Sequence, residues 1–315
     1  MKFSVAIPAF RPRFFREAVE SVLAQSYADW ELVIVDDASP DDLRAIAEPF
    51  LADDRVRFYR NEANFGAVNV VDNWNRCLEY CTGDYIICMG DDDRLLPNCL
   101  ERLCAAIELS PDYGLYHTRT QIISESGSVV ETLRERPERE SSLEMICERW
   151  RGRSQFIGDF CFKLDLLRKN GGFFKLPLAW GSDDVSAYIA AKGDGSKVKD
   201  GVINVNAIGF QYRTNGATIS SDNSYRIKLN ALLESAEWFE RELALRSNSA
   251  DGAVCPSDIL KVFSERFRSY AKFYVRKDIV NDKTAIKYWL SRRKQIGLTV
   301  WDISLGSLKA LITKR

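Results

Sequence analysis

The sequence predicts an α/β protein built on a doubly wound, mostly parallel β-sheet, and three observations lead to this prediction. Strand-like and helix-like segments alternate strictly from residue 3 to residue 109. The strand-like segments around LVIV (32–35) and YIICM (85–89) are apolar without alternation, as expected for strands that helices cover on both faces. Residues 13–26 carry the amphipathic pattern of a helix with one buried side.

The first part of the chain contains four predicted strands, each followed by a predicted helix. We expect the strands at residues 3–10, 30–39, 55–61 and 84–90, and the helices at residues 13–26, 40–51, 67–81 and 96–109. Sheets of this kind bind ligands at the carboxyl ends of their strands. Three of these ends, at residues 8–10, 36–39 and 90–93, carry unusual residues, so we expect them to converge on one crevice.

The next part of the chain is less regular. Residues 113–133 predict two strands joined by a turn at Ser126 and Gly127. Residues 134–142 are almost wholly polar and include a proline, which predicts a mobile surface loop.

Glycines mark the helix boundaries that follow. A helix is expected to end at residues 171–172, where two glycines stand together. Another is expected to begin after Gly181, with Ser182 as its cap. From Ser224 onward the pattern is mostly helical.

The composition argues against several classes of protein. A net charge of −1 gives no sign of nucleic-acid binding. No run approaches the ~18 apolar residues that span a bilayer, and Pro8 interrupts the N-terminal stretch too early for a signal peptide, so we expect a cytoplasmic protein. Eight cysteines without a C-x-x-C pair, together with a single histidine, predict buried reduced thiols instead of a zinc site.

The stretch GDDDRLLP (90–97) places three consecutive aspartates directly after a buried strand. Adjacent like charges repel, and removing them from water is costly unless a cation lies between them. A cation bound between these carboxylates would offset that cost. The alternative is an acidic turn that caps the next helix, for which Asp93 alone would suffice.

Four motifs in order resemble those of the family 2 glycosyltransferases: SVAIPAF (4–10), ELVIVDDAS (31–39), GDDDRLLP (90–97) and SDD (182–184). This family consists of inverting, nucleotide-sugar-dependent enzymes with the GT-A fold, a Rossmann-like doubly wound sheet. The resemblance covers residues 1–220 and implies a nucleotide-binding half at 1–110 and an acceptor-binding half with a small antiparallel part at 111–220. Residues 221–315 lie outside it and are expected to form a C-terminal helical region.

The resemblance implies Mn²⁺ or Mg²⁺ as the cofactor. Asp92 matches the family's metal-binding carboxylate best, with Asp93 beside the metal and Asp91 near the ribose. The bound metal would act as a Lewis acid on the departing diphosphate.

The resemblance also implies which residues surround the nucleotide. Asp37 would accept a hydrogen bond from the imide N–H of uracil or thymine, which favours a UDP- or dTDP-sugar. Alternatively, Asp36 and Asp37 form only a turn and a helix cap, and Asn64 and Gly66 only start a helix. The nucleotide-binding residues implied are Pro8, Ala9, Phe10, Arg11, Asp36, Asp37, Asn64, Gly66, Asp91 and Asp92.

Inverting transfer requires a base that takes the proton of the acceptor hydroxyl. Asp183 and Asp184 stand where the family has its base, at the start of a helix, and Asp184 matches best. Acids are also common in the first turn of a helix for electrostatic reasons alone. Trp180 either stacks on an acceptor sugar or packs in the core.

Many members of the family carry a late histidine near the diphosphate, whereas this chain has FQYRTNGATISS (210–221) there. Arg213, with Asn215 and Ser220, is expected to face the phosphate, because arginine stays charged and matches phosphate geometry.

The expected function is therefore inverting transfer from a UDP- or dTDP-sugar to a hydroxyl of a glycan or lipid-linked acceptor, in cell-surface polysaccharide synthesis. The alternatives are a sugar nucleotidyltransferase, whose glycine-rich loop after the first strand is missing, and an inactive nucleotide-sugar-binding scaffold, which the retained carboxylates disfavour. Residues 288–315 mix tryptophans, leucines and basic side chains. They form either a peripheral contact with the inner face of the membrane or a tail docked on the protein.

Overall fold

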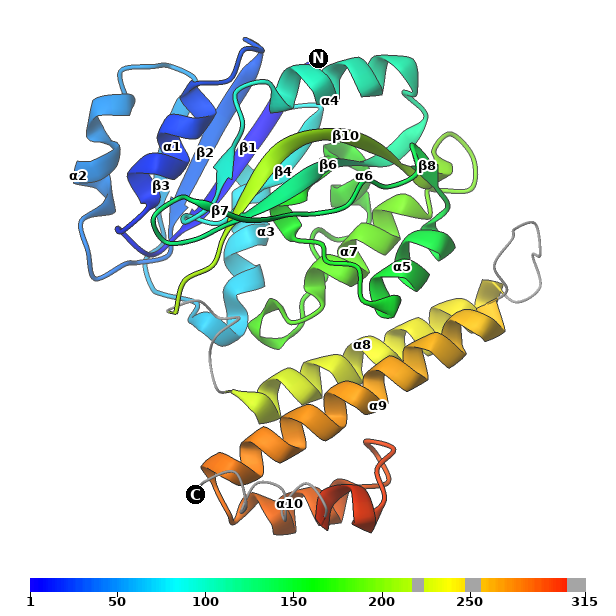
Figure 1. Ribbon diagram of the computed structural model, residues 1–315. Coiled ribbons are helices and arrows are strands. Elements are labelled where there is room, and N and C mark those ends of the chain that lie inside the picture. Colours follow the sequence, from blue (N-terminus) through cyan, green and yellow to red (C-terminus); the bar gives the residue numbers. More distant parts are fainter. Residues whose placement is uncertain (217–223, 247–255, 305–315) are drawn as a thin grey trace.

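A ten-stranded sheet with helices on both faces forms the body of the molecule, and a pair of long helices lies below it (Figure 1). The structure is a computed structural model and describes residues 1–216, 224–246 and 256–304. The strand order is β3-β2-β1-β4-β9-β6-β10-β5, with β7 beside β6 and β8 beside β10.

The strands are β1 (Phe3–Ala9), β2 (Trp30–Asp36), β3 (Val56–Arg60), β4 (Tyr85–Cys88), β5 (Arg94–Leu95), β6 (Tyr113–Ile123), β7 (Val129–Thr132), β8 (Arg139–Glu140), β9 (Phe160–Lys163) and β10 (Lys199–Arg213). The α-helices are α1 (Phe15–Leu23), α2 (Leu43–Ala47), α3 (Val70–Tyr80), α4 (Cys99–Leu109), α5 (Ser142–Arg151), α6 (Leu164–Lys169), α7 (Ser182–Ala191), α8 (Tyr225–Arg246), α9 (Pro256–Asn281) and α10 (Ala285–Arg292). Four short 3₁₀ helices lie at Glu48–Phe50, Ala67–Asn69, Ile157–Asp159 and Pro177–Ala179.

The predicted α/β class is confirmed. Strands β3, β2, β1 and β4 are parallel, and their register pairs Ala9 with Asp36 and Ala6 with Cys88. The carboxyl ends of β1, β2 and β4 therefore meet at one edge of the sheet, as the sequence predicts.

The second half of the chain extends this sheet. Strand β9 runs antiparallel to both β4 and β6, and β10 runs parallel to β6. Residues 1–110 and 111–216 thus contribute to one continuous sheet, and the long β10 returns Arg213 to the edge where β4 ends.

Buried side chains form one apolar cluster on each face of the sheet. In β1, Val5 and Ile7 belong to the cluster under α1, α2 and α4, whereas Ala6 faces the cluster under α3, α5, α6 and α7. The alternation follows from the period of a strand, in which successive side chains point to opposite faces. Burial on both faces explains why these strands read as continuous apolar runs.

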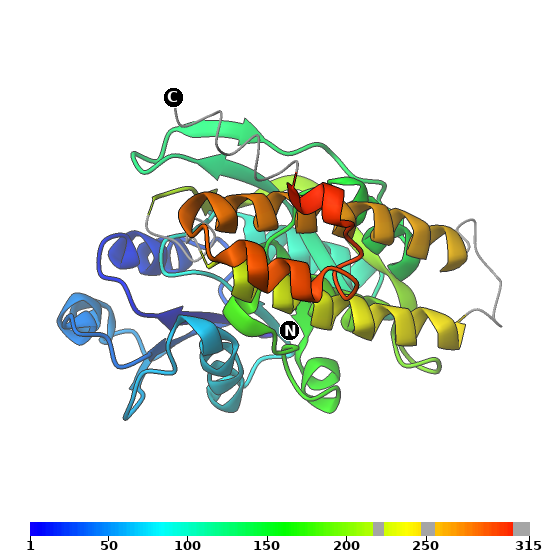
Figure 2. The same cartoon turned by 90° about the horizontal axis from the view of Figure 1, so that it is seen from below.

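Helices α8 and α9 form a hairpin that packs on the helical layer containing α3, α5, α6 and α7; the hairpin lies in front in the view from below (Figure 2). Phe239 and Phe263 join the cluster of that layer, where Trp150 packs between them at ring distances of 4.7 and 4.1 Å. A third cluster surrounds the buried Trp289, whose indole N–H donates to Asp278 at 2.8 Å. The predicted helical character after residue 224 is confirmed for the described residues.

Three local predictions were wrong. The helix expected at 40–51 is only α2 followed by a 3₁₀ turn, since Pro49 lacks the N–H that a longer helix needs. The expected mobile loop at 134–142 contains strand β8, and Glu140 and Arg136 are buried. Ser182 does not cap α7; Gly181 occupies the cap position, and the Ser182 hydroxyl accepts a hydrogen bond from the backbone N–H of Leu176.

The seven cysteines that the structure describes are free and buried, as predicted, and Cys255 lies outside the described residues. Within the same part of the chain, no helix has both the length and the apolarity needed to cross a bilayer.

Glu31 is a buried carboxylate that ties β2 to its neighbours. It accepts hydrogen bonds from Ser4 and Lys2 at 2.7 and 2.8 Å, from Arg57 at 2.6 Å and from the Thr82 hydroxyl at 2.7 Å. Burial pushes the pKa of Glu31 upward, but the hydrogen bonds from Lys2, Thr82 and Ser4 outweigh it and lower the pKa to about 2.

Replacing Glu31 with Gln should therefore destabilise the fold by about 3 kcal/mol at neutral pH. Because the folded-state pKa is depressed, this contribution is fully present above about pH 4.5 and is lost as the pH falls toward 2. Urea unfolding of both proteins across this range measures the effect, and Asp112→Asn, which removes an exposed pair with Lys199, is the matched control. A constant difference between the two proteins down to pH 2 would contradict the linkage.

Candidate functional site

The ends of β1 and β4 are joined by Asp91. Its carboxylate accepts hydrogen bonds from the backbone N–H groups of Phe10 and Arg11, both at 2.7 Å. Burial, followed by repulsion from Asp92, raises the pKa of Asp91 to about 6. One oxygen of Asp91 thus fixes the loop after β1, which leaves Phe10 with 39% of its surface exposed at the mouth of the crevice.

The end of β2 is held in a similar way. Asp36 is fully buried, pairs with Arg60 and accepts a hydrogen bond from the backbone N–H of Ser39 at 2.8 Å, so it shapes the turn and does not face the crevice. Asp37 accepts hydrogen bonds from the Asn61 amide at 2.8 Å and from the Phe65 backbone N–H at 3.1 Å.

Asp37 also anchors the segment that carries Asn64 and Gly66. The Asn64 side chain donates to the backbone carbonyl of Asp37 at 2.7 Å, and Gly66 adopts a φ of 78°. These contacts bring Asn64 and Gly66 beside the end of β2. Pro8 is half-buried and Ala9 is buried at the end of β1.

Asp92 Oδ1 and Asp93 Oδ2 both lie close to Gly90. Asp92 Oδ2 accepts a hydrogen bond from Asn215 at 2.8 Å, and Asp93 Oδ1 accepts one from the backbone N–H of Arg213 at 2.9 Å. A Cβ atom at Gly90 would stand 2.8 Å from Asp92 Oδ1 and 3.0 Å from Asp93 Oδ2. Burial raises the pKa of Asp92, and burial together with repulsion from Asp92 raises that of Asp93.

This pair of carboxylates fits a divalent cation. No group of three or more His, Cys, Asp or Glu side chains suited to a metal occurs among the described residues. Mg²⁺ and similar ions need only one or two protein carboxylates when substrate phosphates and water complete the shell. A cation here would also relieve the repulsion between two buried acids.

Arg213 does not face a phosphate site, so that prediction was wrong. The side chain is 1% exposed, and its guanidinium lies 4.1 Å from the centre of the Phe14 ring. Its donors reach the Asp92 carbonyl at 2.8 Å, the Glu125 carbonyl at 2.9 Å and the Glu17 carboxylate at 2.7 Å. Arg213 therefore supports the acidic turn from behind, while Ser220 lies outside the described residues.

A cavity of about 330 Å³ connects the acidic turn with the start of α7. Asp93 forms part of its wall on one side, and Asp183, Asp184 and Trp180 form part of it on the other. Trp180 is half-buried, with the Lys228 ammonium 4.6 Å from its ring centre. Asp93, which was predicted to lie beside the metal, thus opens onto the same space as the predicted acceptor-side residues.

The two aspartates of α7 have different surroundings. Asp184 accepts hydrogen bonds from Arg149 Nε at 2.7 Å and from Gln155 Nε2 at 2.9 Å. Burial, followed by repulsion from Asp184, raises the pKa of Asp183 to about 8. Asp183 is therefore the group whose environment favours taking up a proton, whereas Asp184 is held in place by Arg149 and Gln155.

The sequence analysis missed Arg149 and Gln155 because it did not identify α5. A signal was present: Ser141 and Glu144 form a capping box at the start of that helix. Arg149 lies in the last turn of α5, where its side chain contacts Asp184.

Comparisons with known proteins bear on this site. The model of the family described as glycosyl transferase family 2 matches residues 4–170. A putative glycosyltransferase, EpsE of Bacillus subtilis, is 36% identical over 117 residues, which cover 36% of this chain and 41% of EpsE. The GalNAc(5)-diNAcBac-PP-undecaprenol beta-1,3-glucosyltransferase of Campylobacter jejuni is 31% identical over 104 residues, which cover 32% of this chain and 33% of that protein. The chain thus spans less than half the length of both relatives.

Solved structures resemble the whole chain. The crystal structure of S. aureus TarS 1-349 covers 100% of this chain and 92% of its own, with a TM-score of 0.65 and 14% identity. The same protein in complex with UDP-GlcNAc gives a TM-score of 0.59 at 16% identity, with coverage of 99% of this chain and 92% of its own. The mannosyltransferase PcManGT of Pyrobaculum calidifontis, in complex with GDP-Man and Mn²⁺, covers 99% of this chain and 80% of its own, with a TM-score of 0.53 and 17% identity. At these identities the likeness supports the fold alone, and it agrees with the predicted GT-A class.

Proposed function

The chain belongs to glycosyl transferase family 2, and from this membership we propose that it transfers a sugar from a nucleotide-sugar donor to an acceptor hydroxyl with inversion at the anomeric carbon. The observation that carries the proposal is the cavity shared by Asp93 and Asp183. A sugar whose diphosphate lies at the acidic turn would present its anomeric carbon to this cavity. Attack from the side of Asp183, opposite the leaving diphosphate, gives inversion.

The donor is a UDP- or dTDP-sugar. Asp37 Oδ1 accepts hydrogen bonds from Asn61 and Phe65, and Oδ2 shares the Phe65 N–H at 3.2 Å but keeps capacity to accept another hydrogen bond. The N3–H group of uracil or thymine is a matching donor, while cytosine and adenine present an acceptor there. The exposed Phe10 ring beside Pro8 would cover the base. The UDP-GlcNAc complex of TarS agrees with this choice, and the GDP-Man complex of PcManGT shows that the fold also serves purine donors.

Mn²⁺ or Mg²⁺ is the proposed cofactor, with Asp92 and Asp93 as its protein ligands. When bound, the ion would neutralise the diphosphate and stabilise its charge as it leaves. The chain's own part is to hold the two carboxylates in place through Asn215 and the Arg213 backbone. The Mn²⁺ found with PcManGT supports a divalent requirement.

Asp183 is the proposed base and Asp184 its positioning partner. The sequence favoured Asp184, but Arg149 and Gln155 both donate hydrogen bonds to one oxygen of that carboxylate and fix it in a positioning role. Asp183 lies in the same cavity with a pKa raised to about 8, which makes it the stronger base once it is ionised.

The acceptor is a glycan or a lipid-linked glycan, in cell-surface polysaccharide synthesis. The undecaprenol-linked substrate named for the Campylobacter jejuni relative supports a lipid-linked acceptor. Phe273, Val300 and Trp301 are between 49% and 75% exposed on the C-terminal helices, and basic side chains accompany them. This surface suits a peripheral contact with the inner face of a membrane, where such acceptors reside.

The base assignment predicts contrasting variants. Asp183→Asn should lower kcat by about 10²- to 10⁴-fold without weakening UDP binding, because the amide keeps the shape and loses the basicity. In the unchanged protein, kcat/KM should rise with pH toward an apparent pKa near 8. Asp184→Asn should remain partly active and shift that pKa downward, since it removes the repelling charge. Full activity of Asp183→Asn beside an inactive Asp184→Asn would assign the base to Asp184.

The metal assignment predicts a role for Gly90. Activity should vanish in chelator and return with Mn²⁺ or Mg²⁺. Gly90→Ala should weaken UDP binding at least tenfold in the presence of Mn²⁺ and leave the metal-free affinity unchanged, because the methyl group displaces both carboxylates. Gly216→Ala is the control, since its methyl group would have no neighbour within 4 Å among the residues that the structure describes. Turnover without any divalent ion would refute the assignment.

The nucleobase assignment predicts a reversal of preference. UDP and dTDP should bind at least tenfold more tightly than CDP or ADP, because two facing acceptors cost ~1–3 kcal/mol. GDP should also bind at least tenfold more weakly: guanine does carry a ring N–H, but its two rings should not fit a slot that Pro8 and Phe10 wall for a single ring. Asp37→Asn keeps the acceptor that holds Asn61 and Phe65 but turns its other atom into a donor, so it should lower UDP affinity and raise CDP affinity. Calorimetric titration with Mn²⁺ measures both, with Asp41→Asn as the control. Equal affinities for GDP and UDP in the unchanged protein would limit Asp37 to holding the loop.

A further inference from the structure

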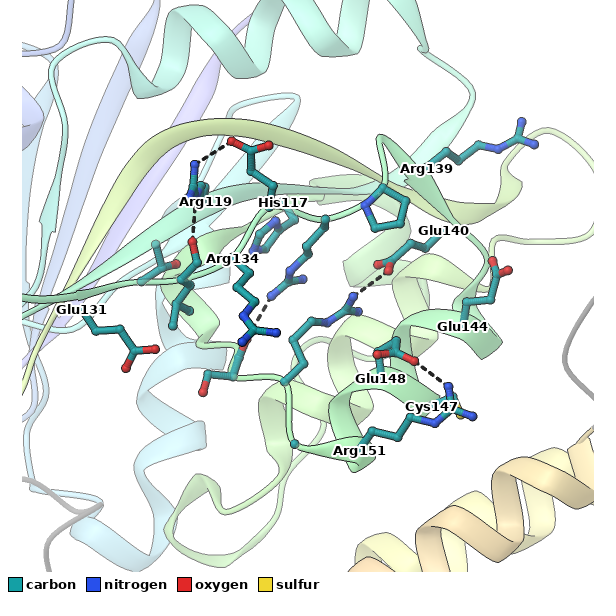
Figure 3. Close-up of a pocket in the computed structure, with 18 residues that line it drawn as sticks. His117, Arg119, Glu131, Arg134, Arg139, Glu140, Glu144, Cys147, Glu148 and Arg151 are labelled. Atoms are coloured by element: carbon teal, nitrogen blue, oxygen red, sulfur yellow. Dashed lines mark hydrogen bonds and ion pairs between the residues drawn. The ribbon is translucent and has the colours of Figure 1, made fainter.

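A second and larger cavity, of about 730 Å³, lies outside the crevice described above (Figure 3). Its walls come from β6, β7, residues 133–140 and the outer side of α5. The sequence does not indicate this cavity, because its pattern at residues 134–142 predicts a mobile loop.

The walls of this cavity are rich in charge. Three of its arginines are paired with acids that also line it: Arg119 with Glu135 at 2.9 Å, Arg151 with Glu148 at 2.6 Å, and Arg153 with Glu140 at 2.6 Å. In Figure 3 the Arg139 side chain points away from the other labelled residues. Arg134 and Arg136 also line the cavity, and neither forms an ion pair within 4.0 Å with a described acid.

Arg136 is held rigidly with a free donor. Its backbone N–H donates to Asn206 at 2.9 Å, and its carbonyl accepts from the same side chain at 2.8 Å. The side chain is 6% exposed and donates one hydrogen bond, to the Ser154 carbonyl at 3.1 Å. Its Nη1 is buried without a hydrogen-bond partner among the described residues. Asp159 and Glu140 offset part of the guanidinium charge, but the buried Nη1 donor still costs free energy unless an acceptor such as an oxyanion completes it.

His117 adds a second unsatisfied group to the same wall. It is 3% exposed, and neither ring nitrogen has a hydrogen-bond partner in the described part of the chain. Its Nε2 lies 3.7 Å from Asp159 Oδ2, too far for a hydrogen bond. Burial, followed by repulsion from Arg136, lowers the pKa of His117 to about 4, so the ring is neutral at physiological pH and still offers one N–H donor.

The cavity adjoins the acceptor side of the crevice. Arg153 lines the larger cavity and Gln155 lines the smaller one, so their Cα atoms are separated by at most about 7.6 Å. Arg149 bridges the two, because it binds Asp184 through Nε and donates from Nη1 to the Arg153 carbonyl at 3.2 Å.

We propose that this cavity binds an oxyanion, a carboxylate or a phosphate, that the acceptor carries at a distance from the attacked hydroxyl. The planar donor fork of arginine matches both groups, and Arg136 with Arg134 would supply it. The identification of the ligand as part of the acceptor rests on the proposed function, whereas the oxyanion site itself does not. The acceptor would accordingly be an acidic glycan.

Binding of small probes tests the site independently of catalysis. Calorimetric or NMR titration with glucuronate, glucose 6-phosphate and glucose should show at least tenfold weaker binding of the neutral sugar. The tighter of the two anions identifies which oxyanion the site prefers. Arg136→Gln should reduce anion affinity at least tenfold. If this buried variant does not fold, Arg134→Gln is the second test; it changes an exposed side chain and should reduce anion affinity several-fold. Arg151→Gln, which alters an arginine already paired on the same wall, should change it less than twofold.

Two results would overturn the proposal: glucose binding as tightly as the anions, or anion binding that Arg136→Gln and Arg134→Gln leave unchanged. Displacement of the anions by UDP would also overturn it, since the anions would then occupy the donor crevice. Failure of the proposed function looks different, because UDP would not bind while the anions still did.

Discussion

Three adjacent aspartates at the end of β4, of which Asp91 and Asp93 are buried and Asp92 is half-buried, place a concentration of negative charge that the rest of this site must accommodate. Asp91 receives two backbone N–H groups from the end of β1, Asp93 receives the backbone N–H of Arg213, and Asp92 receives the side chain of Asn215. These donors are neutral, and they fix the carboxylates without cancelling the charge, so the pKa of each stays raised. Because the negative charge is not cancelled, the site favours binding of a cation. The bound cation would in turn attract an anionic ligand.

The supporting arrangement reaches far along the chain. Strand β10 pairs with β6 over most of its length and brings Arg213 behind the acidic turn, where the guanidinium joins Glu17, Asp92 and Glu125. On the acceptor side, Arg149 performs a comparable task by holding Asp184 and the segment that separates the two cavities. The buried Arg213 and the half-buried Arg149 thus position acids and are assigned no contact with substrate.

The sequence was sufficient for features that depend on local pattern. Continuous apolar runs identified the parallel strands, and the strand ends located Asp37, Asp92 and Asp93 on one edge. It was insufficient where long-range pairing decides the outcome. Arg213 has the composition of a phosphate ligand, but its burial depends on contacts with residues about 90 to 200 positions away. Residues 134–142 are polar in sequence and yet become a cavity wall, because Asn204 and Asn206 of β10 bind their backbone.

The most direct test of the central claim is a crystal structure of the chain with UDP and Mn²⁺, in which anomalous scattering locates the metal. The account predicts the ion within bonding distance of Asp92 or Asp93 above Gly90, bridged to the diphosphate, with the uracil ring against Asp37. A metal bound elsewhere, or a diphosphate seated away from the acidic turn, would contradict it.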